Sequence, residues 1–150
     1  MSRLALLCCA VALVGCAASD ETADTPEETT VPTIALADVA GAWTVRAMAE
    51  GSDSIITTYE MIATDNMEGW TMAFPDRDPV PLRVVAVDGD SIVAEAGPFE
   101  SVLRAGVMVS VRSVSRLHEG MMMGTFVARY ETGEADSVLN GRLEGERSMN

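Results

Sequence analysis

The stretch LRVVAVDGDSIVAEA, residues 82–96, decides the fold, because it encodes a complete β-hairpin. Its two halves, 82–87 and 91–96, are rich in valine, isoleucine and alanine, and the sequence Asp-Gly-Asp separates them. Glycine adopts the positive φ angles of a tight hairpin turn without steric cost. Runs of β-branched residues bounded by such turns are typical of antiparallel strands. The stretch therefore predicts two neighbouring strands joined by a tight turn.

The same sequence pattern continues on both sides of this hairpin, from about residue 36 to residue 147. Short runs in which apolar and polar residues alternate are separated by Gly, Asp and Pro. This alternation places the apolar side chains of a strand on one face. The segments that we expect to form strands are 42–48, 54–64, 69–74, 82–87, 91–96, 107–117, 121–131 and 137–147.

The expected eight or nine strands follow one another at roughly ten-residue spacing, and no helix of more than one turn is predicted between them. Short connections favour antiparallel pairing of strands that are consecutive in the chain. A flat meander of this length would expose unpaired edges, and closure into a barrel removes them. We therefore predict an all-β fold, a small closed antiparallel barrel, with a two-sheet sandwich as the alternative.

The composition excludes several classes of function. The chain has 23 acidic and 10 basic residues and a formal net charge of -13, and all the basic residues are arginines. Binding of nucleic acid needs a basic patch that neutralises phosphates, so no nucleic-acid partner is expected. The lack of lysine removes Schiff-base chemistry and amine nucleophiles.

Residues 1–15 are typical of a signal peptide. Arg3 supplies the positive charge, and the apolar run 4–14 is shorter than the roughly 20 residues that a membrane-spanning helix needs. The run ends in Leu-Val-Gly-Cys, residues 13–16, which resembles the lipobox of bacterial lipoproteins. The resemblance implies that Cys16 carries a diacylglycerol, that the chain is cleaved just before it, and that the new amino terminus is acylated.

The lipobox resemblance implies where the protein works. Acyl chains on Cys16 would hold the mature chain at a membrane, outside the cytoplasm. The next residue, Ala17, is not the Asp that resembles an inner-membrane retention signal, which implies the outer membrane, facing the periplasm, in a Gram-negative host. The alternative is a secretory signal cleaved after Ala17 or Ala18, without a lipid. Because Cys8 and Cys9 fall in the removed segment, no thiol remains in the folded domain.

A flexible tether is predicted for residues 16–35. It contains five acidic residues, no basic residue and two prolines. Such a segment buries too little apolar surface to offset the entropy of ordering, and its like charges extend it. The expected organisation is therefore a signal peptide (1–15), a lipidated tether (16–35), a barrel domain (36–147) and a disordered tail (148–150).

Gly41-Ala42-Trp43, at the start of the first expected strand, resembles the Gly-x-Trp signature of lipocalins and lipocalin-like domains. The resemblance implies that Trp43 plugs one end of the barrel and that an arginine on or after the last strand lies across it. Arg142 and Arg147 are the available partners, and a cation–π contact would be favourable. The chain has no second lipocalin motif and no cysteine pair, so the resemblance implies a small lipocalin-like barrel and no particular ligand.

Metal binding is not the expected role of the single histidine and the methionine run. His118 lies in a predicted turn, and Met121 and Met123 fall on one face of the strand that follows. Thioethers and imidazole bind Cu(I), which makes a soft-metal site the alternative. However, imidazole-based sites normally use more than one histidine, and methionine is a common filler of cores. We expect His118 to be exposed and the methionines to pack.

Catalysis is not expected either. Asp76 with Asp78, or Glu95 with Glu100, could form an acid–base pair. Aspartate and proline are, however, ordinary turn residues, and no glycine-rich phosphate loop leads from a strand into a helix. We therefore expect no enzyme activity and no cofactor.

Three functions remain, and the sequence favours the first two equally. The first is a binding module for a small apolar ligand, with a pocket formed by Trp70, Met72, Val109 and Val111. The second is a structural or interaction lipoprotein that contacts another envelope protein, because a small barrel can be filled by its own side chains. The third is a carrier of Cu(I) or another soft metal. An open apolar interior would favour the first function, and a packed interior would count against it.

Overall fold

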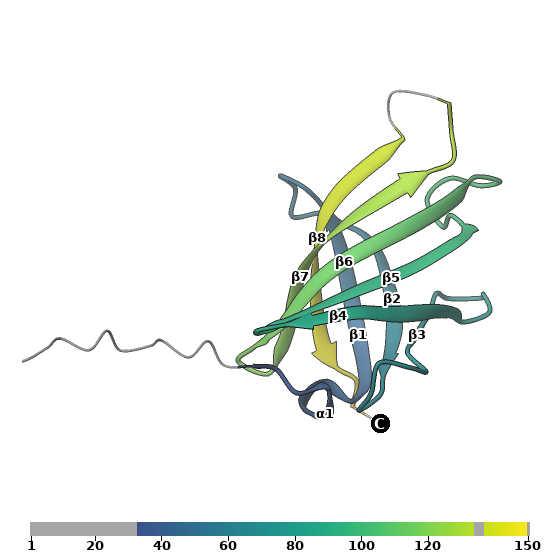
Figure 1. The fold of residues 1–150 in the computed structure, drawn as a ribbon. Coiled ribbons are helices and arrows are strands. Elements are labelled where there is room, and N and C mark those ends of the chain that lie inside the picture. The colour runs from purple at the N-terminus through teal and green to yellow at the C-terminus, as the bar shows by residue number, and fades with distance from the viewer. Residues whose placement is uncertain (1–32, 134–136, 150) are drawn as a thin grey trace, which may run out of the picture.

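The computed structural model describes residues 33–133 and 137–149, and within them one short helix precedes eight strands (Figure 1). The predicted signal peptide, Cys16 and most of the tether lie outside the described residues. The elements are α1 (Leu36–Val39), β1 (Gly41–Ala49), β2 (Ile55–Ala63), β3 (Thr71–Ala73), β4 (Val80–Asp88), β5 (Ser91–Glu100), β6 (Met108–His118), β7 (Met121–Tyr130) and β8 (Val138–Arg147).

The eight strands form a closed antiparallel barrel, which confirms the predicted fold. Each strand pairs with the next one along the chain, and β8 pairs with β1 from Trp43↔Arg147 to Ala49↔Gly141. This last pairing joins the two ends of the meander, so the backbone N–H and C=O groups of both strands find partners. The sandwich alternative is therefore excluded.

The opening hairpin forms as predicted. Asp88 pairs with Ser91, and Gly89 in the turn has a φ angle of 55°. The β6–β7 hairpin is equally tight, because His118 pairs with Met121 and both turn residues have positive φ angles. These turns fix the register, so the side chains that face the interior are determined on all four strands.

A bulge in β5 changes which side chains of that strand face inward. Ala96 pairs with Val111, and the next pair is Phe99 with Val109, so β5 advances by three residues while β6 advances by two. Gly97 lies within the bulge with a φ angle of 106°, and a Cβ atom there would come within 2.6 Å of the Val109 carbonyl oxygen. The extra residue places Phe99 on the interior side together with Ala96.

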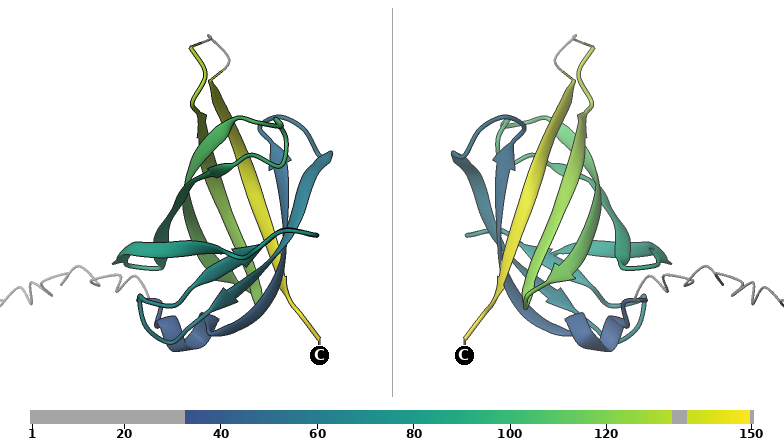
Figure 2. Two further views of the ribbon diagram at one scale, coloured as in Figure 1. Left: turned by 90° about the vertical axis from the view of Figure 1, so that its right-hand side faces the viewer. Right: turned by 90° about the vertical axis from the view of Figure 1, so that its left-hand side faces the viewer.

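The two ends of the barrel differ. Figure 2 shows α1 and the C-terminal end of the described chain at one end, with the β1–β2 connection at the other. Val39 of α1 and Trp43 of β1 are completely buried at the first end. Among the described residues, no helix has the length and apolar character required to cross a bilayer.

Hydrogen bonds extend slightly beyond the predicted domain limits. Ile34, expected in the tether, donates its backbone N–H to the carbonyl of Gly89 at 2.9 Å. Ser148, expected in the disordered tail, donates its N–H to the carbonyl of Ala42 at 2.9 Å. Both segments are therefore bonded to the end of the barrel that carries α1.

Candidate functional site

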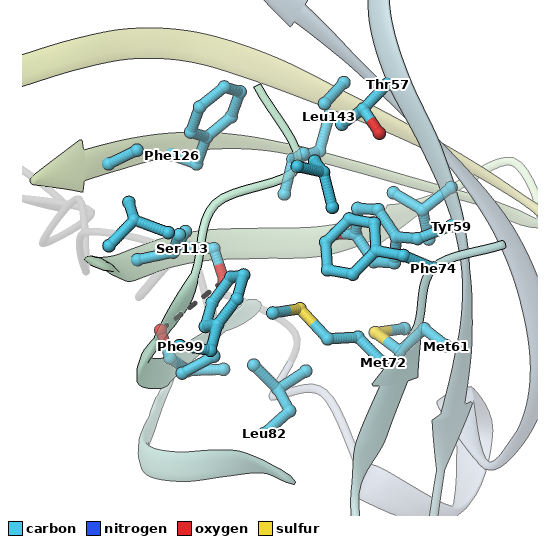
Figure 3. A pocket seen from close by; sticks show the side chains of 18 of the residues that line it. Thr57, Tyr59, Met61, Met72, Phe74, Leu82, Phe99, Ser113, Phe126 and Leu143 are labelled. Atoms are coloured by element: carbon cyan, nitrogen blue, oxygen red, sulfur yellow. Dashed lines mark hydrogen bonds between the residues drawn. The ribbon is translucent and has the colours of Figure 1, made fainter. Parts of the chain in front are cut away.

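The interior of the barrel contains a cavity of about 90 Å³ (Figure 3). All eight strands contribute side chains to its wall, and most of these side chains are apolar. The four residues that the sequence predicts for a ligand pocket, Trp70, Met72, Val109 and Val111, all line it. They come from different parts of the chain, and closure of the barrel brings them together.

Trp43 closes the end of the interior that carries α1. Its side chain is completely buried, and its Nε1–H donates a hydrogen bond of 2.8 Å to the carbonyl oxygen of Val39. The next inward-facing residue of β1, Val45, already lines the cavity. A buried indole N–H needs a hydrogen-bond acceptor, and α1 supplies it.

Arg147 is the arginine that lies across Trp43. Its guanidinium carbon is 4.5 Å from the centroid of the indole ring. The same guanidinium donates hydrogen bonds to the carbonyl oxygens of Ala40 at 2.8 Å and of Asp38 at 2.6 Å. Arg147 therefore joins the last strand, the first strand and the helix at one point.

Arg142, the other arginine considered for this role, does not reach Trp43. It lies opposite Met48 in the β1–β8 ladder, near the other end of the barrel. There it donates hydrogen bonds to the carbonyl of Ser52 at 3.1 Å and to the carboxylate of Asp53 at 2.7 Å. The reason is the register: five residues along an extended strand separate the two arginines by roughly 17 Å.

Three aromatic rings form a row along one side of the cavity. The ring centroids of Tyr59 and Phe74 are 5.4 Å apart, and those of Phe74 and Phe99 are 5.9 Å apart. Figure 3 shows Tyr59 and Phe74 side by side, with Phe99 facing Met72. Aromatic pairs at these separations attract each other beyond their shared burial. The row leaves a wall that is apolar and of defined shape.

Hydroxyl groups are the polar groups that the described wall offers to a ligand. Ser113 donates a long bond of 3.5 Å to the carbonyl of Ala94. Thr57, Tyr59 and Ser115 also line the cavity, and their hydroxyls make no hydrogen bond to any described residue. Burial raises the pKa of the Tyr59 phenol well above its ordinary range, because an ionised phenolate would be poorly solvated there. Tyr59 is therefore a neutral hydrogen-bonding group.

The cavity reaches the surface beside the β5–β6 connection. Leu103 in that connection lines the cavity, yet 42% of its surface is exposed. Ser101 holds the loop in shape, since its buried Oγ accepts hydrogen bonds of 3.0 Å from the N–H groups of Leu103 and Arg104. Its own N–H donates to the carbonyl of Val107 at 2.8 Å. We call this opening the mouth of the cavity.

Arg77 links the β3–β4 connection to the mouth. Its guanidinium donates to the carbonyl oxygens of Glu100 at 2.7 Å and of Ser101 at 3.4 Å. Arg104, on the other side of the loop, lies over the ring of Tyr130 with 4.2 Å between its guanidinium carbon and the ring centroid. Two arginines therefore fix the rim through the backbone and an aromatic ring.

The charged residues singled out as acid–base candidates lie outside the cavity. Asp76 and Asp78 are exposed in the β3–β4 connection, beside Glu100. Glu95 lies on the outer face of β5, where it accepts hydrogen bonds from Arg112 and from Arg83, the latter at 2.7 Å. The hydrogen bond from Arg112 is the largest cause of a lowered pKa for Glu95; desolvation opposes it, and the weaker effect of the hydrogen bond from Arg83 lowers the pKa further.

His118, Met121 and Met123 lie at the β6–β7 hairpin. The side chain of His118 is 70% exposed, and that of Glu119 approaches it to 4.0 Å. Met121 and Met123 are half-buried on the outer face, whereas Met122 points into the cavity. Among the described residues, no group of three or more His, Cys, Asp or Glu side chains is arranged to hold a metal ion.

Three features of the site were not predicted. Phe99 enters the cavity through the β5 bulge, which breaks the simple alternation on which sequence prediction relies. Tyr59 lies in the expected strand 54–64, but no sequence signal distinguished its face of the strand as the interior. Ser101 precedes Leu103 by two residues and Arg104 by three, and its Oγ accepts hydrogen bonds from both N–H groups. Serine often accepts such backbone hydrogen bonds in turns, so this residue was a sequence signal for the loop.

Comparison of the chain with protein-family models, with curated proteins and with solved structures gave no match.

Proposed function

We propose that this protein is a lipid-anchored extracytoplasmic binding module whose barrel takes up a small apolar ligand. The observation that supports the proposal is the cavity, which is lined by apolar side chains and opens at the mouth. An apolar wall with a few hydroxyl groups is the usual chemistry of small-molecule sites. Closure by Trp43 and Arg147 at the other end leaves one route of entry among the described residues.

The size of the cavity limits the ligand. Its volume of about 90 Å³ is below the roughly 300 Å³ of common ligand pockets, and an engineered cavity of about 150 Å³ holds benzene. A bulky ring system would not fit without rearrangement of the wall. A slender ligand that enters end-on, with its remainder at the mouth, fits this space.

A fluorescence titration tests ligand binding. 1,6-Diphenyl-1,3,5-hexatriene, an uncharged rod-shaped dye that can enter end-on, should bind the protein and brighten. Val111→Phe adds a ring to the cavity wall and should weaken dye binding by about tenfold or more, since overpacked sites resist further filling. Val114→Phe places the same ring on the outer face of the same strand, where Val114 is 40% exposed, and should leave binding unchanged. Equal effects of the two variants, or no dye binding by the unchanged protein, would contradict the proposal.

The lipid anchor rests on the lipobox resemblance around Cys16. Two or more acyl chains give stable attachment, and the acidic segment after Cys16 would hold the barrel away from an anionic surface. The mature protein should partition into detergent after Triton X-114 phase separation, with a mass that includes diacylglycerol and an acyl chain. Cys16→Ser should move it to the aqueous phase. A mature chain that begins after Cys16 would exclude the anchor.

The small cavity volume also favours a second candidate function. A barrel that its own side chains nearly fill could be a structural or interaction lipoprotein that contacts another envelope protein and holds no ligand. Crosslinking in the native envelope separates the two functions. A discrete crosslinked partner, together with no dye binding, is the result expected for this second function.

A further inference from the structure

The wall of the cavity carries no charge. None of the described residues that line it is an Asp, Glu, Arg, Lys or His. A charged group that leaves water for such a site loses its hydration without gaining an ion partner, which is strongly unfavourable. The interior therefore selects against ligands whose charged group would have to enter it.

The polar groups inside are instead neutral hydroxyls, and some of them make no hydrogen bond to a described residue. Tyr59 lines the cavity and makes no hydrogen bond to a described residue. Ser115, which is 8% exposed, lines it as well and is likewise without a hydrogen bond to a described residue. These hydroxyls are accessible inside the cavity, so a ligand atom that enters it can complete a hydrogen bond with them. These hydroxyls match a ligand with an uncharged oxygen.

The rim adds a second selection against anions. Asp76, Asp78 and Glu100 gather beside the mouth. Arg77 donates to backbone carbonyls there, and Arg104 lies against the ring of Tyr130. Because the whole chain has a net charge of -13, it repels an anionic head group near the mouth at long range.

From these observations we propose that the ligand is an uncharged single-chain amphiphile, whose hydrocarbon chain occupies the barrel and whose hydroxyl or carbonyl oxygen bonds to Tyr59. This inference rests on the proposed binding function and specifies its ligand class. A single chain suits the narrow volume, and a neutral oxygen suits the unpaired phenol. A free fatty acid in its ionised form, with the same chain, is excluded by the uncharged wall and the acidic rim.

Displacement of 1,6-diphenyl-1,3,5-hexatriene by three ligands with the same chain tests the ligand class. Methyl dodecanoate, 1-dodecanol and dodecanoate are compared at pH 7.5, each below its aggregation limit. The ester and the alcohol should displace the dye at concentrations about tenfold or more below that of dodecanoate, because only dodecanoate carries a charge. Displacement by dodecanoate at an equal or lower concentration would overturn the inference.

Tyr59→Phe tests the role of the phenol. It removes one hydroxyl and keeps the ring that contacts Phe74 in a tilted arrangement, and it should weaken binding of the ester by about five- to tenfold. Thr58→Val removes an exposed hydroxyl from the next position of β2 and should change affinity less than about twofold. An ester affinity in Tyr59→Phe that equals that of the unchanged protein would overturn the assignment of Tyr59.

The outcomes also separate this inference from the proposed function. If the dye does not bind the unchanged protein, the binding function itself fails. If the dye binds and dodecanoate competes best, the binding function stands and the uncharged ligand class is wrong. Thermal melts of both variants show whether a loss of affinity reflects a loss of folding.

Discussion

Replacement of Arg147 should destabilise the barrel measurably, whereas the same replacement of Arg142 should not. The two arginines lie on the same strand and differ in their surroundings. Arg147 covers the Trp43 ring and bonds two backbone carbonyls, whereas Arg142 bonds one backbone carbonyl and pairs with Asp53, whose side chain is 96% exposed. The substitutions Arg147→Met and Arg142→Met remove the charge and every donor and keep most of the length of the side chain.

The structure gives the expected magnitudes. A partly exposed cation–π contact contributes about 0.5–1 kcal/mol, and hydrogen bonds from a charged donor add about as much again once solvent exposure is considered. The loss in Arg147→Met should therefore be about 1–2 kcal/mol. The exposed pair formed by Arg142 should contribute much less, because solvent screens it. For a domain of this length, 1 kcal/mol corresponds to about 4 °C in the melting temperature.

Differential scanning calorimetry of the two variants and the unchanged protein provides the comparison. Arg147→Met should melt about 4–8 °C lower, and Arg142→Met should stay within about 4 °C of the unchanged protein. Urea titrations followed by tryptophan fluorescence should give the same order of the free energies of unfolding. Equal shifts in the two variants, or a larger shift in Arg142→Met, would refute the assignment of Arg147 as the residue that closes the barrel.

Three further outcomes are expected. Gly141→Ala should lower the free energy of unfolding in urea titrations by about 2 kcal/mol or more, because its Cβ would lie 2.2 Å from the Met48 carbonyl oxygen. The control Gly145→Ala, whose Cβ has its nearest contact at 3.2 Å, should lower it by less than half as much. The pKa of Glu95, followed by carbon NMR, should lie below its ordinary value of 4.5 and rise in Arg112→Gln. Because the folded-state pKa is lowered, the stabilisation by Glu95 is complete above the ordinary value and is lost as the pH falls through the folded-state pKa. Titration of Cu(I) should give the same affinity for Met123→Leu as for the unchanged protein, and a loss of affinity would favour the soft-metal carrier instead.

Much of the fold could be predicted from local patterns. The alternation of apolar and polar residues located all eight strands, and the Asp-Gly-Asp turn located the hairpin around Gly89. Trp70, Met72, Val109 and Val111 were predicted to form a ligand pocket, and all four line the cavity. These predictions worked because a strand that faces a core on one side has a two-residue period that depends only on the chain itself.

Other features depended on contacts between distant segments. The choice between Arg142 and Arg147 required the β1–β8 register, which no local pattern contains. The entry of Phe99 required the β5 bulge, where one extra residue reverses which side chains face inward. The mouth could not be predicted, because Arg77 reaches the carbonyl oxygens of the β5–β6 connection from a different loop.

The sequence by itself determined the strands, their tight turns, the acidic character of the chain and the lipobox-like segment that ends at Cys16, because each depends on residues that are neighbours along the chain. Only the tertiary structure decided that the sheet closes on itself, that Arg147 covers Trp43, and that a cavity remains inside, in which the Tyr59 hydroxyl makes no hydrogen bond to a described residue. The physical reason is that closure, register and residual volume result from the packing of all eight strands together, and side-chain volumes that meet across a barrel are not encoded in any one of its strands.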